Sequence, residues 1–266
     1  MMLNIPLLKT SFKKTSKLMI GLTVLISFYL LVTAGMYDPS GETDLMEALP
    51  EAMRDVLGME IGPQTIESFL STGFYNASFL IFMVIFSLLV ANQLLVTLVD
   101  RGSMAYLLTT PVARKKVAFT QAAVLVISIL FISTVTMVVG VFGINVIVSD
   151  ADLHLSTFLQ INVLAFLLFF VIGGYAFLFS SIFNETKKAF AASGGLTLIF
   201  YMLNIFANTG QDVGWLKYFT LFSVFQPLEI VNGTMNVFLA SIGLGAAGIL
   251  LYFVSIAIFS KRDLPL

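Results

Sequence analysis

The sequence has no cysteine and a single histidine, His154. Without cysteine the chain forms no disulfide and no thiolate metal site. One histidine alone builds no metal cluster, so we expect His154 to be an ordinary loop residue. Charge is scarce too: Asp, Glu, Lys and Arg make up 11% of the 266 residues, where soluble domains carry about 25%. With 58% hydrophobic residues and a mean hydropathy of +0.98, this composition is typical of a membrane protein.

Charged residues are missing altogether from six long apolar runs. These runs cover residues 18–36, 74–99, 117–148, 157–183, 189–207 and 234–259. About 20 apolar residues span a bilayer as a helix, and a spanning segment must pair its own backbone groups. The first run is longer than the roughly 7–15 apolar residues of a signal peptide. The prediction is an all-α integral membrane protein with six transmembrane helices in one domain, 1–266.

The remaining charges are divided between the two sides of the predicted spans. Twelve of the 14 basic residues fall on the side of both chain ends: Lys9, Lys13, Lys14, Lys17, Arg101, Arg114, Lys115, Lys116, Lys187, Lys188, Lys261 and Arg262. Twelve of the 15 acidic residues fall on the other side. Because short cytoplasmic loops are enriched in Lys and Arg, the N- and C-termini are predicted to be cytoplasmic.

The segment before the first span is amphipathic. Leu7, Leu8 and Phe12 share one helical face, and lysines recur every four residues beside them. This pattern predicts a short interfacial elbow helix over 6–17, and a flexible basic tail is the alternative.

The outer connections also predict short helices. In the acidic outer loop 37–73, Thr43 can cap a helix over 43–57, and a second short helix is expected after Pro63. The outer segment 208–233 is rich in aromatic residues that suit a membrane interface. We predict a re-entrant region there, with short helices that enter the outer leaflet just before the last span.

The cytoplasmic loop 100–116 holds more than a plain connection needs. Met104, Leu107 and Leu108 follow at helical spacing, and Pro111 and a basic run come after them. The apolar residues would form one face of a short helix, which fits a groove in a partner protein. The alternative is a helix that lies on the lipid, with the basic run only enforcing orientation.

This loop resembles the signature of the type-2 ATP-binding-cassette (ABC) permeases, acid-x-G-T-x-x-x-L-L-x-x-P-[VI]-x-R. The matching residues are Asp100, Gly102, Leu107, Leu108, Pro111, Val112 and Arg114. Ser103 stands where threonine is usual, and Asp100 where glutamate is usual. Segments 46–58, 216–233 and 259–264 resemble the family's outer loop, the stretch before its last helix and its ending. The resemblance therefore covers essentially the whole chain.

The resemblance implies that the loop is a coupling helix that docks on an ATPase subunit. The residues expected to carry this contact are Asp100, Arg101, Gly102, Ser103, Met104, Leu107, Leu108, Pro111, Val112 and Arg114. Arg101 and Arg114 are expected to form salt bridges with the ATPase. Two ATPase subunits and a second permease chain, identical or a sister, would complete the assembly. The chain itself has no GxxxxGK[ST] motif, so we expect no cofactor, metal or catalytic residue in it and place ATP and Mg²⁺ in the ATPase.

The same resemblance places a translocation path at the interface of the two permease chains, along the second and fifth spans. The polar residues available to line it are Asn76, Asn92, Gln93, Thr97, Thr197 and Asn204. Ordinary interhelical hydrogen bonds, worth about 0.6 kcal/mol each, are the alternative for each of them. An uncharged path suits export of an amphipathic peptide, toxin or drug across a bacterial plasma membrane.

Two other functions stay open. An autonomous channel or carrier would need ionisable residues inside its helices, and the six runs have none. A membrane assembly or sensor protein could use the same loop to bind a partner without transport. A neighbouring gene for an ATPase would favour the permease over these two functions. Membrane lipid is expected as a further partner, and nucleic acid is not.

Overall fold

The computed structural model describes residues 3–37, 65–104, 112–148, 153–209 and 211–262, and these ranges contain helices but no β-strand. The elements are α1 (Ile5–Gly35), α4 (Ile66–Leu70), the π-helix η1 (Ser71–Phe79), α5 (Leu80–Leu94), α6 (Val96–Asp100), α8 (Arg114–Ile147), α9 (Leu155–Ile182), α10 (Thr186–Thr209), the 3₁₀ helices η2 (Gln211–Phe219) and η3 (Phe222–Val224), α11 (Pro227–Val231) and α12 (Val237–Lys261).

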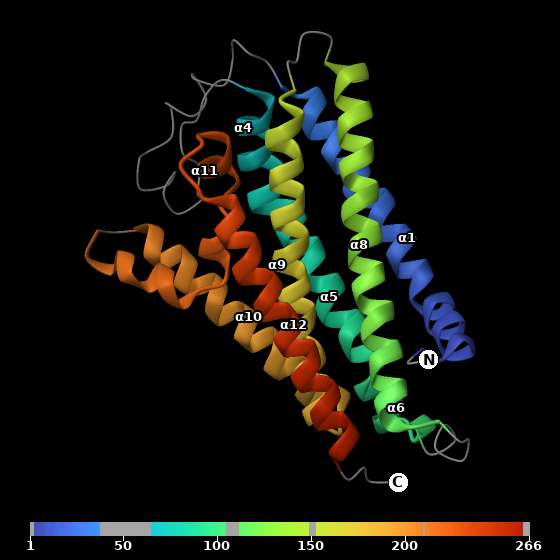
Figure 1. Cartoon of the computed structure of the whole chain (residues 1–266). Coiled ribbons are helices and arrows are strands. Elements are labelled where there is room, and N and C mark those ends of the chain that lie inside the picture. Colours follow the sequence, from blue (N-terminus) through green and yellow to red (C-terminus); the bar gives the residue numbers. More distant parts are fainter. Residues whose placement is uncertain (1–2, 38–64, 105–111, 149–152, 210, 263–266) are drawn as a thin grey trace.

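Six helical segments in the described part of the chain are long and apolar enough to cross a membrane: α1, the run from α4 to α6, α8, α9, α10 and α12. The prediction of a six-span, all-α protein is therefore confirmed. Figure 1 shows the spans side by side, with α9 in the middle of the bundle. The helix predicted over 43–57 lies outside the described residues.

The second span begins at Ile66, whereas the apolar run that predicted it begins at 74. The Thr65 hydroxyl caps its first turn, so the short helix expected at this end of the outer loop is part of the span itself. Glu67 is consequently buried within that turn. Its carboxylate accepts a hydrogen bond from the backbone amide of His154 and lies 3.4 Å from the His154 Nδ1. His154 thus joins the start of α9 to the second span.

The first helix is continuous from the predicted elbow segment into the first span. The backbone amide of Asn4 donates to the Thr120 hydroxyl of α8 at 3.0 Å, and the Lys14 ammonium donates to the Gln93 carbonyl of α5 at 3.4 Å. The first turns of α1 therefore bridge α8 and α5. That these turns lie in the membrane interface stays a prediction.

Glycine lets α9 and α12 approach closely. A Cβ on Gly173 would lie 2.8 Å from a tyrosine hydroxyl of α12, and a Cβ on Gly248 of α12 would lie 2.3 Å from the Phe170 ring of α9. Real Cβ atoms do not approach so closely, so these two positions need glycine. Gly243 and Gly245, also on α12, meet nothing within 4 Å in the described chain. The contact of α12 with α9 therefore depends on Gly248 rather than on these two glycines.

The outer segment after α10 forms three short helices, η2, η3 and α11, as predicted for 208–233. Figure 1 shows α10 leaning out of the bundle and η2 turning back beside it. The Thr220 hydroxyl donates to the Phe200 carbonyl at 2.6 Å and fixes this return. Trp215, Tyr218 and Phe219 are exposed, which suits the membrane interface expected for them. Their depth in a bilayer stays a prediction.

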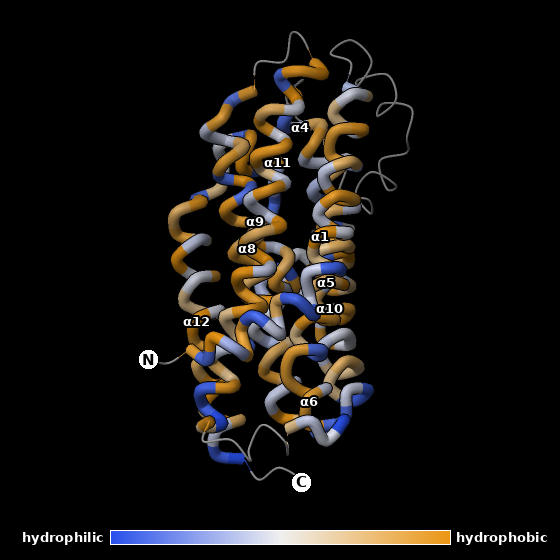
Figure 2. Tube along the Cα trace, turned by 90° about the vertical axis from the view of Figure 1, so that its right-hand side faces the viewer, coloured by the Kyte–Doolittle hydropathy of each residue, from blue (hydrophilic) through white to orange (hydrophobic). Residues whose placement is uncertain are grey.

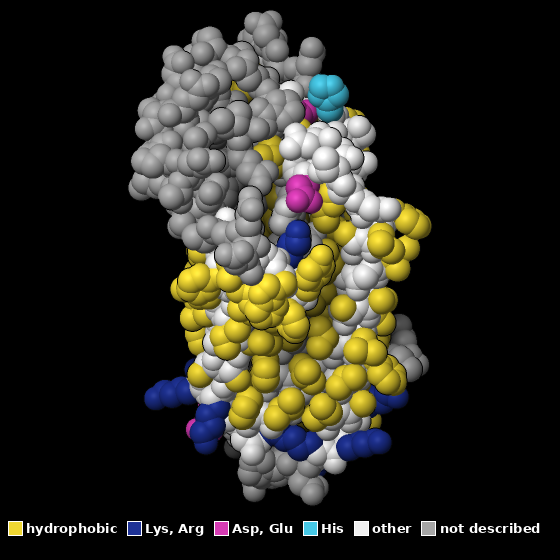
Figure 3. Space-filling view, turned by 90° about the vertical axis from the view of Figure 1, so that its left-hand side faces the viewer, with side chains coloured by type: hydrophobic (Ala, Val, Ile, Leu, Met, Phe, Trp, Pro, Cys, Tyr) yellow, Lys and Arg dark blue, Asp and Glu magenta, His cyan; other side chains and the backbone are white. Residues whose placement is uncertain are grey.

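Hydropathy and charge follow the long axis of the bundle. Figure 2 shows hydrophobic residues along most of α8, α9 and α12. Figure 3 shows a broad hydrophobic surface, with most of the visible Lys and Arg side chains around the end that carries the chain termini and the histidine at the opposite end. A belt of this kind between two polar ends is the surface of a membrane-spanning protein.

Candidate functional site: the cytoplasmic loop and its anchors

The start of the loop 100–116 is tied to the start of α10. One oxygen of Asp100, Oδ2, accepts from the backbone amide of Thr186 at 3.2 Å and from its hydroxyl at 2.7 Å. The first amides of a helix have no partner within the helix, and a carboxylate there also opposes the positive end of the helix dipole. Asp100 lies just beyond the apolar run, and these two hydrogen bonds hold its pKa below the ordinary value.

The glycine of the signature ends the second span. Gly102 has φ of +68°, and its amide donates to the Val99 carbonyl at 3.0 Å. This left-handed conformation is costly for residues with a Cβ, whereas glycine adopts it freely. No atom lies within 4 Å of the place where a Cβ would stand. The need for glycine here is therefore conformational rather than steric.

The end of the loop is tied to two other spans through a pair of arginines. Arg114, the first residue of α8, donates from Nη1 to the Arg262 carbonyl at 2.8 Å. Arg262, which follows α12, donates from its own Nη1 to the carbonyls of Ser181 at 2.6 Å and Phe183 at 3.2 Å. These carbonyls lie at the end of α9, where helix carbonyls lack intrahelical partners. The start of α8 is thus joined to the ends of α12 and α9.

The two ends of the loop's apolar stretch pack inward. Met104 is fully buried within this chain's own core, and Val112 is partly buried against it. An ATPase could not reach the Met104 side chain in this arrangement, so Met104 anchors the loop to the bundle. Arg101 is exposed and Ser103 is half-buried. The signature residues Leu107, Leu108 and Pro111 lie outside the described residues.

Two of the four path residues predicted on the second span, Asn92 and Thr97, have an internal partner. The Asn92 amide donates to the Leu88 carbonyl at 2.7 Å, and Ser180 of α9 donates to the Asn92 Oδ1 at 3.3 Å. At Leu95 the helix is interrupted between α5 and α6. The Asn92 carbonyl there accepts from the Thr97 hydroxyl at 3.0 Å. Both Asn92 and Thr97 thus serve helix packing and helix continuity.

The remaining path residues do not gather at one place. Thr197 of α10 is buried and shares a hydrogen bond of 2.5 Å with the Tyr175 hydroxyl of α9. Asn204 has a buried Oδ1 without a hydrogen-bond partner. Asn76 lies in the π-helix near the start of the second span, and Gln93 lies near the end of α5. A path that uses them would extend over most of the bundle's length.

Sequence reasoning missed Thr186 and the structural role of Arg262. Both lie far along the chain from the loop, and neither belongs to the loop signature. A threonine that opens a helix after a short polar connection is a recognisable capping signal. The Arg262 contacts go to backbone carbonyls, which every residue has, so no sequence pattern could have identified them.

Six apolar spans and a loop fastened at both ends to other spans define a multi-pass membrane protein whose loop is mechanically joined to the bundle. The sequence pattern of the family described as ABC-2 family transporter protein matches residues 10–264. The chain belongs to this family, and the permease resemblance is confirmed. A comparison with curated proteins finds no match. The protein is accordingly a membrane component of a transport system.

Proposed function

We propose that this chain is the permease subunit of an ATP-driven exporter, and that the loop 100–116 receives the motion of an ATPase supplied as a separate subunit. The family assignment supports transport. The observation that carries the mechanism is the fastening of the loop at both ends. Asp100 joins its start to α10, and Arg114 joins its end to α12 and, through Arg262, to α9.

This fastening gives a physical route from nucleotide to membrane. ATP favours one arrangement of the ATPase pair because it binds that arrangement more tightly. A displaced loop pulls on α10 through Asp100 and on α8 through Arg114, while Met104 keeps the loop attached to the bundle core. Leu107, Leu108 and Val112 supply the docking contact, and Arg101 supplies an exposed charge for a salt bridge. The contact between Arg114 and the Arg262 carbonyl leaves Arg114 with a role inside the permease as well.

A second permease chain, identical or a sister, covers the sparsely packed flank of the bundle. Of the six candidate spans, α10 has the smallest buried share in its most apolar window, 17%. The second span presents Ile81, Ile85 and Leu89 outward at helical spacing. The path lies between this stripe, α10 and their counterparts in the second chain. An uncharged apolar wall of this kind supports an amphipathic peptide, toxin or drug as cargo.

The test is to co-purify the chain with its candidate ATPase and measure ATP hydrolysis with and without the double change Leu107→Asp and Leu108→Asp. Two charges on the docking face should abolish assembly or cargo-stimulated hydrolysis. Ala113→Asp is the matched control, because Ala113 is exposed at the N-cap of α8, where aspartate is favourable. Unchanged assembly and hydrolysis in the double variant would reject the coupling role and favour an autonomous carrier or an assembly protein.

A further inference from the structure

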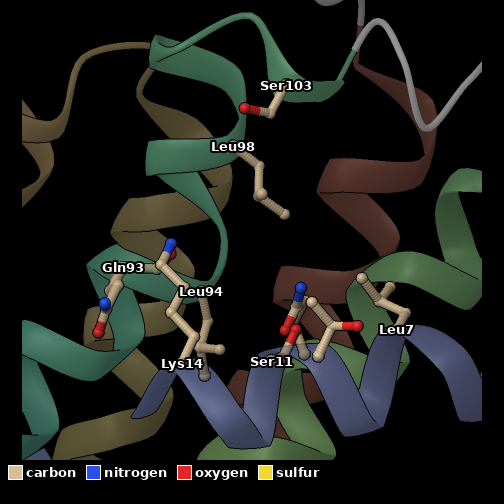
Figure 4. Close-up of a pocket in the computed structure, with 9 residues that line it drawn as sticks. Leu7, Ser11, Lys14, Gln93, Leu94, Leu98 and Ser103 are labelled. Carbon is tan, nitrogen blue, oxygen red and sulfur yellow. The ribbon is translucent and has the colours of Figure 1, made fainter.

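A cavity of about 340 Å³ lies on the cytoplasmic side of the bundle, between the first turns of α1, the second span and α8. Its lining includes Leu7 and Lys14 of α1, Leu94, Leu98 and Ser103 of the second span and the loop start, and Gln121 of α8. Figure 4 shows Leu7, Ser11 and Lys14 of α1 on one side of this space and Leu98 and Ser103 on the other. None of these described lining residues is acidic, so the cavity has no charge that would repel an anion.

Gln121 of α8 is the most deeply buried polar residue of this lining. It is 1% exposed, and its Oε1 has no hydrogen-bond partner. An unpaired buried acceptor is unfavourable, and most such groups in proteins are paired. The Gln121 side chain therefore offers an acceptor to a ligand that carries a hydroxyl or ammonium donor.

Lys14 is the charged group of the cavity. Its ammonium has three donors, and the contact in the described structure is the long one, 3.4 Å, to the Gln93 carbonyl. The group is partly desolvated, and the positive charge of Arg101 acts on it. An anion bound beside Lys14 would offset the desolvation of the Lys14 ammonium. It would also offset the repulsion between the charges of Lys14 and Arg101.

We propose that this cavity binds a phosphate ester that also carries a hydroxyl donor, with the phosphate on Lys14 and the hydroxyl on Gln121. The volume lies at the small end of small-molecule sites, which begin at about 300 Å³, and it matches a polar headgroup rather than a peptide. Leu7, Leu94 and Leu98 accommodate the carbon skeleton. Basic pockets between helices on the cytoplasmic side of a membrane take phospholipid headgroups. A ligand held here also touches Ser103, at the first turn of the loop.

Binding to the whole purified chain tests the proposal without any ATPase, so the result is independent of the proposed function. Native mass spectrometry in detergent is used to titrate the protein with phosphatidylglycerol, with phosphatidylcholine, and with soluble glycerol 3-phosphate. Phosphatidylcholine keeps the phosphate but has no donor in its headgroup, and its quaternary ammonium cancels the phosphate charge, so the variant Gln121→Met isolates the contribution of the donor. We expect phosphatidylglycerol to bind about tenfold more tightly than phosphatidylcholine, as the loss of one hydrogen bond to a charged or buried group predicts.

Two variants and a matched control assign the site. Lys14→Met and Gln121→Met should each weaken phosphatidylglycerol binding by about tenfold. Lys13→Met removes the neighbouring exposed lysine, which does not line the cavity, and should leave binding within about twofold. If Gln121→Met fails to fold, Lys14→Met carries the test, because Lys14 is exposed and its loss leaves the core intact.

Two results overturn the proposal. Equal binding of phosphatidylglycerol and phosphatidylcholine removes the donor requirement, and equal loss from Lys13→Met and Lys14→Met shows general attraction to basic residues. If glycerol 3-phosphate displaces phosphatidylglycerol at an equal concentration, the site is supported and its ligand is a soluble phosphate ester. If phosphatidylglycerol binds and glycerol 3-phosphate does not displace it, the site is supported and its ligand is a membrane lipid headgroup.

Discussion

The Asp100 carboxylate holds the first residue of α10 by two hydrogen bonds to Thr186, one to its amide and one to its hydroxyl. The two residues are 86 positions apart in the chain, so this contact is a tertiary link between the second and fifth spans. It makes the acidic position of the loop signature a helix cap for another part of the protein. The link predicts that a displacement of the loop start also displaces the start of α10.

Replacement of Asp100 by alanine should therefore loosen the start of α10. The Thr186 amide loses its acceptor, and hydrogen–deuterium exchange of the peptide that covers residues 186–190 should accelerate. Asp100→Asn keeps a side-chain oxygen at the same place and should retain most of the protection. Equal exchange in the alanine variant and the unchanged protein would show that the contact does not hold α10.

The same contact predicts a pH dependence. The pKa of Asp100 is lower in the folded protein than its ordinary value of 3.8, so the stabilising contribution of the carboxylate is fully present above that ordinary value. It is lost only as the pH falls below 3.8 towards the folded pKa. Protection of residues 186–190, corrected for intrinsic exchange, should thus stay constant between about pH 7 and 5. A loss of protection within that range would indicate a different titrating group.

Gly102 should tolerate asparagine better than alanine. Its positive φ costs a residue with a Cβ about 1 kcal/mol, whereas asparagine visits this conformation more readily. Gly102→Ala should lower unfolding stability in an SDS titration by about that amount, and Gly102→Asn by clearly less. Because no atom stands within 4 Å of the added Cβ, equal losses in the two variants would mean that crowding by a neighbour, not φ, sets the requirement.

The Arg262 guanidinium should resist replacement by lysine. Its Nη1 reaches two carbonyls at the end of α9, which a single ammonium on a flexible stem holds poorly. Because Arg262 is partly exposed, Arg262→Lys should lower the free energy of unfolding by about 1 kcal/mol in the SDS titration. Lys261→Arg is the control, since none of the described hydrogen bonds or ion pairs involves the Lys261 side chain. A lysine variant as stable as the unchanged protein would show that charge alone suffices.

Gly248 should be the sensitive glycine of α12. In Gly248→Ala the added Cβ falls 2.3 Å from the Phe170 ring, so the Phe170 ring or one of the two helices must shift, at about 1–3 kcal/mol. Gly243→Ala adds the same group where nothing lies within 4 Å. Thermal unfolding of the two variants in detergent should separate them. Equal melting temperatures would contradict the close approach of α9 and α12.

The spans could be predicted from sequence because a bilayer imposes long uncharged runs, and all six are present. The start of the second span could not, because its first turns are polar. Ser68 and Thr72 lower the hydropathy there, yet the Thr72 hydroxyl donates to the Ser68 carbonyl at 3.3 Å and satisfies itself within the helix. Glu67 is likewise accommodated by the amide of His154. Local pairing of polar groups extends the helix beyond what composition alone indicates.

The sequence could indicate the loop 100–116 as a candidate site but could not indicate the contacts that fasten it to the bundle. The apolar spacing around Met104 predicted a helix face for a partner protein, whereas Met104 is buried in this chain's own core. A periodic pattern indicates that one helix face is apolar. It does not indicate whether a partner protein or this chain's own core covers that face. The contacts of Arg114 and Arg262 are with backbone carbonyls, whose positions depend on the complete fold.

The close approach of α9 and α12 has a consequence for biosynthesis. A ribosome delivers α9 to the membrane before α10, the outer segment and α12, so the glycine-lined face of α9 meets lipid until α12 arrives. The Arg262 contacts that join α12 to α9 form later still. The bundle therefore closes only after α12 has been inserted, and a nascent chain arrested before that point lacks every contact that α12 makes with α9.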